Sequence, residues 1–477
     1  MLFNSWPFIL FFLSVLLIYF SLPFKWRAPL LLVASYIFYA AWKWEFALLM
    51  LAVSLLNFYT GKKIGESENP KSRRRWLALA LVLSLAPLVY FKYANFFIGN
   101  FIALMEQLGV TGNLKYLNVI LPVGISFFTF QALSYSLDVY NKKTKVEPSI
   151  VNFTVFVSFF PQLVAGPIER SAHLLSQFRE KHYFQSEKFI EGSKLFIWGL
   201  FKKIVIADRL APYVDRIYEH PEIYSGSTLA VATLFFAIQI YCDFSGYSDM
   251  AIGSARILGF RLMQNFNLPY LAGSIGNFWK RWHISLSSWF GDYLYIPLGG
   301  NRVKYPRWVF NIFVVFLVSG FWHGASWTFI VWGALHALYY LLENWGDRLL
   351  KLLSIQQIKA TTGYKIFKIV SVFILVCFAW IYFRANNISD AFLISEKIVS
   401  DLNSTVYRGA STVTFVLSLA LIVFLFVVQL FQYFKISSLY FSKPKTHPVL
   451  QLGWYVGLLL GISLLGMSSS AFIYFQF

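Results

Sequence analysis

Long apolar runs with few or no charged residues recur along the whole chain. Seven are clear, at residues 5–24, 76–97, 226–241, 308–322, 365–383, 411–432 and 449–471. A helix that crosses the hydrocarbon core of a bilayer needs roughly 17–25 mainly apolar residues, and these runs approach or reach that length. These apolar runs therefore predict membrane-spanning helices, and with them an all-α polytopic membrane protein with about 10–12 crossings.

The pattern changes between residues 149 and 345, where Pro and Gly interrupt the apolar runs. The interrupted stretches are FFPQLVAGPIER (159–170), YCDFSGYSDMAIG (241–253), NFNLPYLAGSIGNF (265–278) and YIPLGGNR (295–302). Irregular backbone at membrane depth is tolerated only inside protein or beside a water-filled cavity. We therefore expect one domain over 1–477, with N-terminal spans (1–148), a middle part (149–345) of re-entrant and amphipathic helices around a central cavity or tunnel, and C-terminal spans (346–477).

Loop charges predict how the first third is oriented in the membrane. Residues 61–75 carry six basic side chains and 141–147 carry three lysines, whereas 98–117 holds one basic and one acidic residue. Because basic loops stay in the cytoplasm, the first two segments are predicted inside and the N-terminus outside. The same rule explains the net charge of +19 without a nucleic acid partner. The composition, 58% hydrophobic and 13% charged, fits a membrane protein and not a soluble domain.

His323 is the first candidate for chemistry. It lies in LVSGFWHGASWTFIVWGALHAL (317–338), between two apolar runs and beside Trp322. One interpretation is a neutral imidazole hydrogen-bonded between packed helices. The other is a general base for a hydroxyl group, since a titratable residue at membrane depth often marks a functional site. Small residues at 320 and 324–326 favour the second interpretation, because they let backbone or a ligand approach closely.

His283 is the second candidate, in GNFWKRWHISLSSWF (276–290). Aromatic residues with nearby cations are typical of a belt at the membrane interface. The polar residues that follow favour a binding site instead. The candidate substrate-binding residues of such a site are Trp279, Lys280, Arg281, Trp282 and Ser285, together with Trp322 from the stretch around His323. Lys280 and Arg281 could contact a phosphate or another anion.

The remaining candidates are weaker. If one helix continued from His323, His336 would lie about 20 Å further along it and on another face, so the two would not share a pocket. His220 and His447 each precede a proline in a polar loop. Asp243 and Asp249 are possible substrate-binding residues, but a structural ion pair, for example with Arg256, is an equal alternative. Cys242 and Cys377 show no paired spacing, and no metal site is predicted.

Several enzyme patterns are absent from the sequence. It contains no P-loop, no G-x-S-x-G elbow and no H-E-x-x-H motif. ATP-driven transport and zinc proteolysis therefore have little support.

Taken together and in order, these stretches resemble the membrane-bound O-acyltransferase family, and within it the bacterial branch with the membrane subunit of alginate O-acetylation. The resemblance rests on LPVGISFFTFQALSYSLDVY (121–140), FFPQLVAGPIER (159–170), YCDFSGYSDMAIG (241–253), NFWKRWHISLSSWFGDYLYIPLGGNR (277–302) and SGFWHGASWTFIVWGALHA (319–337). It implies that His323 is the essential catalytic histidine and His283 a second functional one, both on a tunnel through the protein. Asn277 and Gly291 depart from the family pattern, which often has an acidic and a basic residue there.

The resemblance also implies the reaction and its setting. An acyl group, acetyl above all, would pass from a cytoplasmic donor such as acetyl-CoA or an acyl carrier to a polysaccharide outside the bacterial inner membrane. No bound cofactor is expected, and extracytoplasmic acyltransferase proteins are the expected partners. D-alanyl transfer to teichoic acid and peptidoglycan O-acetylation are alternatives within the family. A polysaccharide transporter or a secretion scaffold is the alternative of another class.

Overall fold

The computed structural model describes residues 1–477 except 111, 113, 403–404, 435–447, 468–471 and 474–477, so His447 lies outside the described residues. The described residues form helices, turns and irregular segments, with no β-strand among them. The predicted all-α fold class is therefore confirmed. The chain splits into two compact units, unit 1 (Met1–Phe196 and Met250–Met263) and unit 2 (Ile197–Asp249 and Gln264–Phe477). A single domain divided near residues 148 and 345 stays a prediction.

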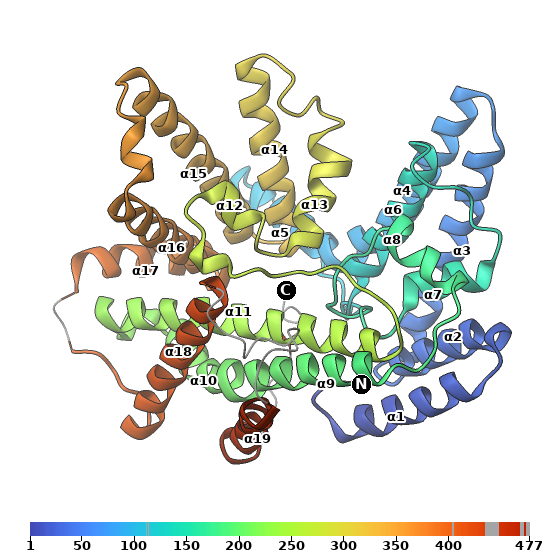
Figure 1. The fold of residues 1–477 in the computed structure, drawn as a ribbon. Coiled ribbons are helices and arrows are strands. Elements are labelled where there is room, and N and C mark those ends of the chain that lie inside the picture. The colour runs from blue at the N-terminus through green and yellow to red at the C-terminus, as the bar shows by residue number, and fades with distance from the viewer. Residues whose placement is uncertain (111, 113, 403–404, 435–447, 468–471, 474–477) are drawn as a thin grey trace. The chain divides into compact units, whose positions relative to one another are not determined.

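Unit 1 is built from the N-terminal helices (Figure 1). They are α1 (Trp6–Ser21), α2 (Phe24–Ala40), α3 (Trp44–Glu66), α4 (Pro70–Leu88), η1 (Val89–Tyr93), α5 (Ala94–Gln107), α6 (Ile125–Tyr140), α7 (Ile150–Ser158), α8 (Ser171–Leu174) and η2 (Leu175–Arg179). Two further helices, α9 (Ser186–Phe201) and α11 (Gly226–Ile257), contribute residues to both units. Asn57 of α3 donates to Ser84 of α4 and accepts from Ser136 of α6, both at 2.8 Å, so a buried hydrogen-bond cluster joins three helices.

Unit 2 contains the remaining helices. They are η3 (Lys202–Ala207), α10 (Asp208–Glu219), η4 (Pro221–Ile223), η5 (Pro269–Leu271), α12 (Ile275–Trp279), α13 (Ile284–Phe290), η6 (Gly291–Tyr295), α14 (Tyr305–His323), α15 (Trp327–Leu352), η7 (Gln356–Ala360), α16 (Thr362–Arg384), α17 (Ile388–Ser400), α18 (Thr412–Tyr433) and α19 (Pro448–Leu465). The two short helices on either side of His283, α12 and α13, therefore lie in this unit.

Six helices in the described part of the chain are long and apolar enough to cross a membrane. They are Trp44–Glu66, Pro70–Gln107, Gly226–Ile257, Tyr305–His323, Thr362–Arg384 and Thr412–Tyr433, and Trp6–Ser21 and Val449–Leu465 are shorter apolar helices. The seven apolar runs of the sequence all fall within these eight helices or overlap them. The protein is therefore a multi-pass membrane protein, and the count of 10–12 crossings stays a prediction.

The expected interruption at residues 241–253 is wrong, because this stretch lies inside the continuous helix α11. Its glycines serve close helix packing instead. A Cβ atom at Gly246 would come within 2.7 Å of the Gly199 carbonyl oxygen, and one at Gly253 within 2.6 Å of that of Gly192. In membrane helices, small residues of this kind let two backbones approach each other. Here glycine indicates a helix contact and not a break.

The other expected interruptions are present. Residues 159–170 form turns after α7, residues 265–278 run through an irregular segment into η5 and α12, and residues 295–302 form turns before α14. The structure therefore places irregular backbone directly before His283 and before the helix that ends at His323.

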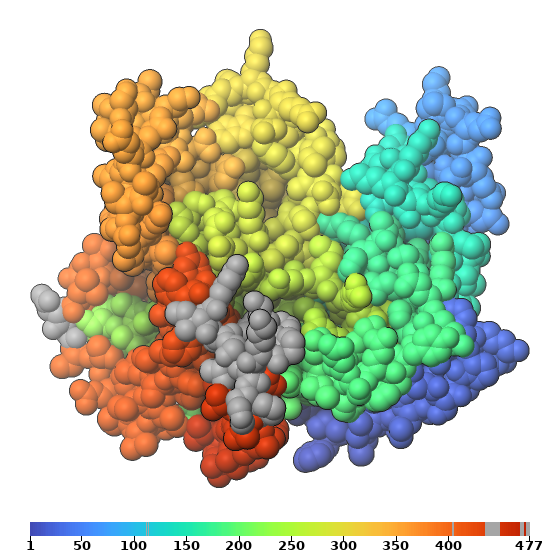
Figure 2. Space-filling model, in the orientation of Figure 1, coloured from blue at the N-terminus to red at the C-terminus, as the bar shows by residue number. Residues whose placement is uncertain are grey.

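Helices α14 and α15 form a close antiparallel hairpin, and this overturns the assumption of one continuous helix through His323 and His336. Helix α14 ends at His323, Gly324 is extended, and the Ser326 side chain accepts from the Thr328 N–H to begin α15. A Cβ atom at Gly320 would overlap the Phe329 carbonyl, which explains how closely the two helices pack. Figure 2 shows the segment before α14 (yellow) and the turn after α15 (orange) at the same end of unit 2.

Candidate functional site

His323 occupies the last position of α14, directly before the turn into α15. Its side chain is buried, with 3% of the residue exposed. Three aromatic rings surround the imidazole, with ring centres 4.9 Å away for Trp322, 5.1 Å for Trp332 and 5.3 Å for Phe383. All three rings meet the imidazole near edge-on. The end of α14 therefore holds a buried imidazole that is enclosed by three aromatic rings, called the aromatic wall below.

His283 joins α12 to α13 and is fully buried. Its backbone is left-handed, with φ of 42° and ψ of 53°, a conformation that costs a residue other than glycine roughly 1–2 kcal/mol. Strained backbone of this kind persists where the surroundings hold it, and it is common at functional sites. The imidazole packs against Phe244 with ring centres 4.6 Å apart and against Trp322 at 6.1 Å. Trp322 therefore contacts both candidate histidines.

Asn265 fixes which nitrogen of His283 carries the proton. The Asn265 Oδ1 atom accepts from the backbone N–H of Ser285 at 3.2 Å and from its hydroxyl at 2.7 Å. Its Nδ2 atom donates to the Ser248 hydroxyl at 3.3 Å. The amide oxygen therefore faces His283, and the Nδ1 atom of His283, 3.3 Å from Oδ1, must be the donor. In the neutral imidazole this leaves the lone pair on Nε2, as a general base requires.

The hydrogen bond to His336 favours the opposite tautomer. The indole N–H of Trp279 donates to its Nδ1 atom at 3.3 Å, so a neutral His336 carries its proton on Nε2. The residue is fully buried on α15. Trp332 separates the two imidazoles of this region, with ring centres 5.1 Å from His323 and 4.9 Å from His336. Because the helix breaks at residue 324, His336 belongs to the same aromatic cluster as His323, against the sequence-based expectation.

A buried network of charges lies beside this cluster in unit 2. Lys203 Nζ contacts Asp243 at 2.7 Å and Asp208 at 2.8 Å, and Lys202 Nζ contacts Asp249 at 2.8 Å. The Asp243 carboxylate also accepts from the backbone N–H of Ile473 at 2.7 Å. A buried charge is stable only when it is paired. The buried Asp243 and the partly buried Asp249 are each paired here with a lysine of η3. The structure thus supports the ion-pair alternative, with Lys202 and Lys203 in place of Arg256.

The other predicted residues are distributed over two places. Trp282 is buried in the aromatic cluster, stacked on Phe278 at 5.6 Å and near Trp380 at 5.1 Å. Arg281 lines a pocket on another side of α12, and Lys280 is exposed. Trp279, Ser285 and Trp322 join the histidine cluster, so the structure brings six of the ten predicted residues together and separates the two cations from them.

Sequence reasoning missed Asn265, Lys202, Lys203 and Trp332. Asn265 stands in an irregular segment, and only its position opposite residues 283–285 reveals its function. The two lysines sit in an apolar stretch, GLFKKIVIA (199–207), and a pair of cations there was a usable signal for buried carboxylate partners. No group of three or more His, Cys, Asp or Glu side chains that could hold a metal occurs among the described residues.

Comparisons with known proteins identify the family. Residues 74–388 match the model of the membrane-bound O-acyltransferase family. The chain is 37% identical to a probable alginate O-acetylase of Azotobacter vinelandii over the full length of both proteins. It is 36% identical to a peptidoglycan O-acetyltransferase of Helicobacter pylori, over 84% of this chain and 80% of the relative.

A more distant relative is a teichoic acid D-alanyltransferase of Bacillus subtilis, 29% identical over 56% of this chain and 69% of the relative. The family match includes both candidate histidines, and the alginate O-acetylase similarity extends over every residue of the chain. The chain belongs to the membrane-bound O-acyltransferase family and is an acyltransferase.

Proposed function

We propose that this enzyme moves an acetyl group from a cytoplasmic thioester donor to hydroxyl groups of an extracytoplasmic polysaccharide. The observation that carries the proposal is the pair of buried imidazoles, His283 and His323, which both pack on the indole of Trp322. Acyl transfer to a hydroxyl needs a base for the hydroxyl proton, and histidine is the side chain that most often supplies it. Relatives that O-acetylate alginate or peptidoglycan support the acceptor class.

In the proposed mechanism, His323 removes the proton of the acceptor hydroxyl as its oxygen attacks the thioester carbonyl. The new ester C–O bond forms, the C–S bond of the donor breaks, and the proton passes from the imidazole to the departing sulfur. His283, with its lone pair on Nε2, assists proton transfer or orients the acceptor. The aromatic wall excludes water, which would otherwise compete as the acceptor.

The donor, partners and location complete the proposal. Acetyl-CoA or an acyl carrier is the proposed donor on the cytoplasmic side, and no cofactor stays bound to the protein. The polysaccharide lies outside the bacterial inner membrane, and extracytoplasmic acyltransferase proteins are the proposed partners there. The loop charges support an N-terminus on the outer side. The similarity to a teichoic acid D-alanyltransferase makes D-alanyl transfer the second candidate.

The test is the acyl ester content of the host's surface polysaccharide, measured by mass spectrometry. Wild type, a deletion strain and His323→Ala are compared at equal membrane levels of the protein. Loss of a general base slows a reaction by about a hundred- to ten-thousand-fold, so His323→Ala should match the deletion. The mass of the missing group separates acetyl from D-alanyl transfer. An ester that persists in His323→Ala but disappears in the deletion would show a transporter or scaffold instead.

A further inference from the structure

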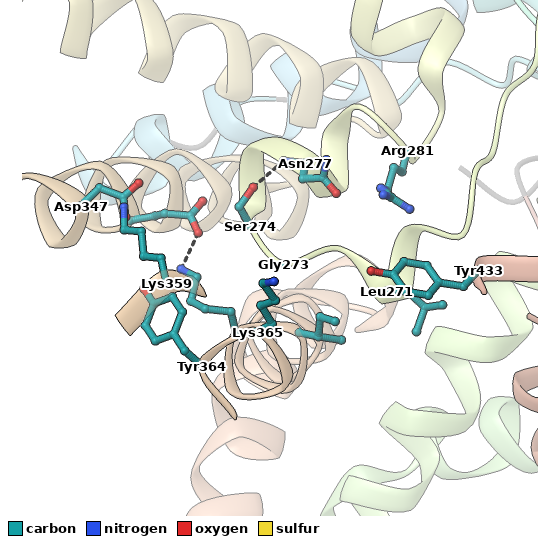
Figure 3. A pocket seen from close by; sticks show the side chains of 13 residues that line it. Leu271, Gly273, Ser274, Asn277, Arg281, Asp347, Lys359, Tyr364, Lys365 and Tyr433 are labelled. Carbon is teal, nitrogen blue, oxygen red and sulfur yellow. Dashed lines mark hydrogen bonds and ion pairs between the residues drawn. The ribbon is translucent and has the colours of Figure 1, made fainter. Parts of the chain in front are cut away.

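A charged pocket lies in unit 2 on the side of α12 away from the histidine cluster. Its volume is about 320 Å³, at the lower end of the range of small-molecule sites. Basic side chains reach it from three parts of the chain, namely Arg281 from the segment after α12, Lys359 from the turn after α15, and Lys365 and Lys368 from α16 (Figure 3). Glu343 and Asp347 of α15 are the acidic side chains of its lining.

The carboxylates of the pocket are already engaged. Lys368 Nζ lies 2.6 Å from Glu343, whose other oxygen accepts from the backbone N–H of Ile275 at 2.8 Å. Lys359 Nζ lies 2.7 Å from Asp347. Arg281 and Lys365 are therefore the two cations of the lining that pair with no carboxylate in the part of the chain described here. The pocket carries two positive charges in excess.

The apolar part of the lining indicates that an anion would be carried on an organic molecule. Leu271, Ile369 and the rings of Tyr364 and Tyr433 share the pocket with the charged residues. An arginine guanidinium binds phosphate oxygens through paired N–H groups, and a lysine ammonium adds a point charge. One arginine with one lysine beside apolar side chains matches a phosphate ester in both charge and surroundings.

Loop charges place this pocket on the cytoplasmic side. Residues 346–368, which follow the main part of α15, carry five basic residues and one acidic residue, and residues 301–307 at the same end carry three basic residues and none that is acidic. Residues 385–411, beyond the other end of α16, carry three acidic and two basic residues. By the positive-inside rule the first two segments face the cytoplasm, where anionic phospholipid headgroups and phosphate-bearing acyl donors both occur.

We propose that this pocket binds the phosphate group of an organic phosphate ester through Arg281 and Lys365. The phosphate can belong to the headgroup of an anionic phospholipid of the cytoplasmic leaflet or to a soluble acyl donor. The binding itself is independent of acyl transfer, and only its second source rests on the proposed function. Because α12 also carries Trp279, the hydrogen-bond partner of His336, an occupied pocket would stabilise the helix that leads to the histidine cluster.

The experiment measures binding of two probes to the purified full chain in nonionic detergent. One probe is phosphatidylglycerol, compared with the zwitterionic phosphatidylcholine, and the other is coenzyme A. Arg281→Gln combined with Lys365→Gln should weaken binding of at least one probe about tenfold or more, and added salt should weaken wild-type binding as well. Loss of phosphatidylglycerol binding alone assigns a lipid site, and loss of coenzyme A binding alone assigns a donor site.

Matched variants keep the result interpretable. Lys351→Gln removes an exposed lysine of α15 that does not line the pocket and should leave both affinities unchanged. The two single variants, each with its unfolding temperature measured, replace the double variant if that protein fails to fold. Equal binding of both probes by wild type and by the Arg281 and Lys365 variants would overturn the proposal. Binding is measured without turnover, so this outcome is distinct from a failure of His323→Ala to lose activity.

Discussion

His283 and His336 are both fully buried among aromatic rings, yet they differ in the ring nitrogen that carries the proton. At His283, Asn265 accepts the Nδ1 proton, so Nε2 holds the lone pair. At His336, Trp279 donates to Nδ1, so Nε2 holds the proton. A neutral imidazole in the first state can accept a proton at Nε2, and one in the second state cannot. Burial alone therefore does not let a histidine act as a base through Nε2, because the partner of Nδ1 determines which nitrogen carries the proton.

Of the changes that test this difference, replacing His283 should have the largest effect on acyl transfer. His283→Ala removes the lone pair and should reduce acyl transfer by about a hundredfold or more. His283→Gln, which keeps a polar side chain of similar length but no basic nitrogen, serves as the matched control and should be equally inactive. Polysaccharide ester content at equal membrane levels is the readout. Activity of His283→Gln close to wild type would show that only hydrogen bonding is needed there.

Asn265 should come next, because it acts through His283. Asn265→Ala removes the acceptor of the Nδ1 proton, worth about 1 kcal/mol, and should lower the rate about five- to tenfold. Asn265→Asp keeps an acceptor but adds a negative charge, which favours the charged imidazole and raises the pKa of the base. The acid limb of the pH–rate profile should then move to higher pH in Asn265→Asp. An unmoved profile in this variant would separate Asn265 from the chemistry.

His336 should affect stability more than activity. His336→Phe preserves the ring packing but leaves the buried N–H of Trp279 without its acceptor, which costs about 1–3 kcal/mol. We expect a lower unfolding temperature in detergent and near wild-type acyl transfer per folded molecule. His336→Gln, with an amide oxygen to accept, should be less destabilised. If His336→Phe were inactive but fully stable, His336 would have a direct role in the reaction.

His173 in unit 1 has a third kind of partner, a carboxylate. Its replacement should have the smallest effect of these predictions, and that effect should be on stability. Its Nδ1 atom contacts the buried Glu169 carboxylate at 2.6 Å, and this hydrogen bond raises the pKa of His173 above its ordinary value. Stability from the pair is fully present below about pH 6.5 and is lost as the pH rises through the raised pKa. The half-exposed side chain limits the effect to less than about 1 kcal/mol.

The measurement for His173 is the unfolding temperature of the purified protein between about pH 6 and pH 9. Wild type should lose more stability across this interval than His173→Gln, which has no titrating group at that position. Parallel curves for the two proteins would show that His173 is not held charged by Glu169.

The sequence was sufficient for the fold class and the family, because apolar run length and the order of five motifs are local properties. The roles of His283 and His323 stay predictions. The sequence was not sufficient where contacts between distant segments determine the local structure. The glycines of 241–253 suggested a break, although Gly246 and Gly253 allow close helix contacts within α11. The sequence pattern does not group His336 with His323, because the helix end between them depends on the hairpin of α14 with α15. Asn265 has no motif of its own, and its function appears only when it faces residues 283–285.

The most direct test of the opposite tautomers is ¹⁵N nuclear magnetic resonance of the full chain labelled at histidine. The spectra of His283→Gln and His336→Gln assign the two residues by the signals that disappear. We expect a proton on Nδ1 and an unprotonated Nε2 in neutral His283, and the reverse in His336. The same tautomer at both positions, or a proton on Nε2 of His283, would contradict it.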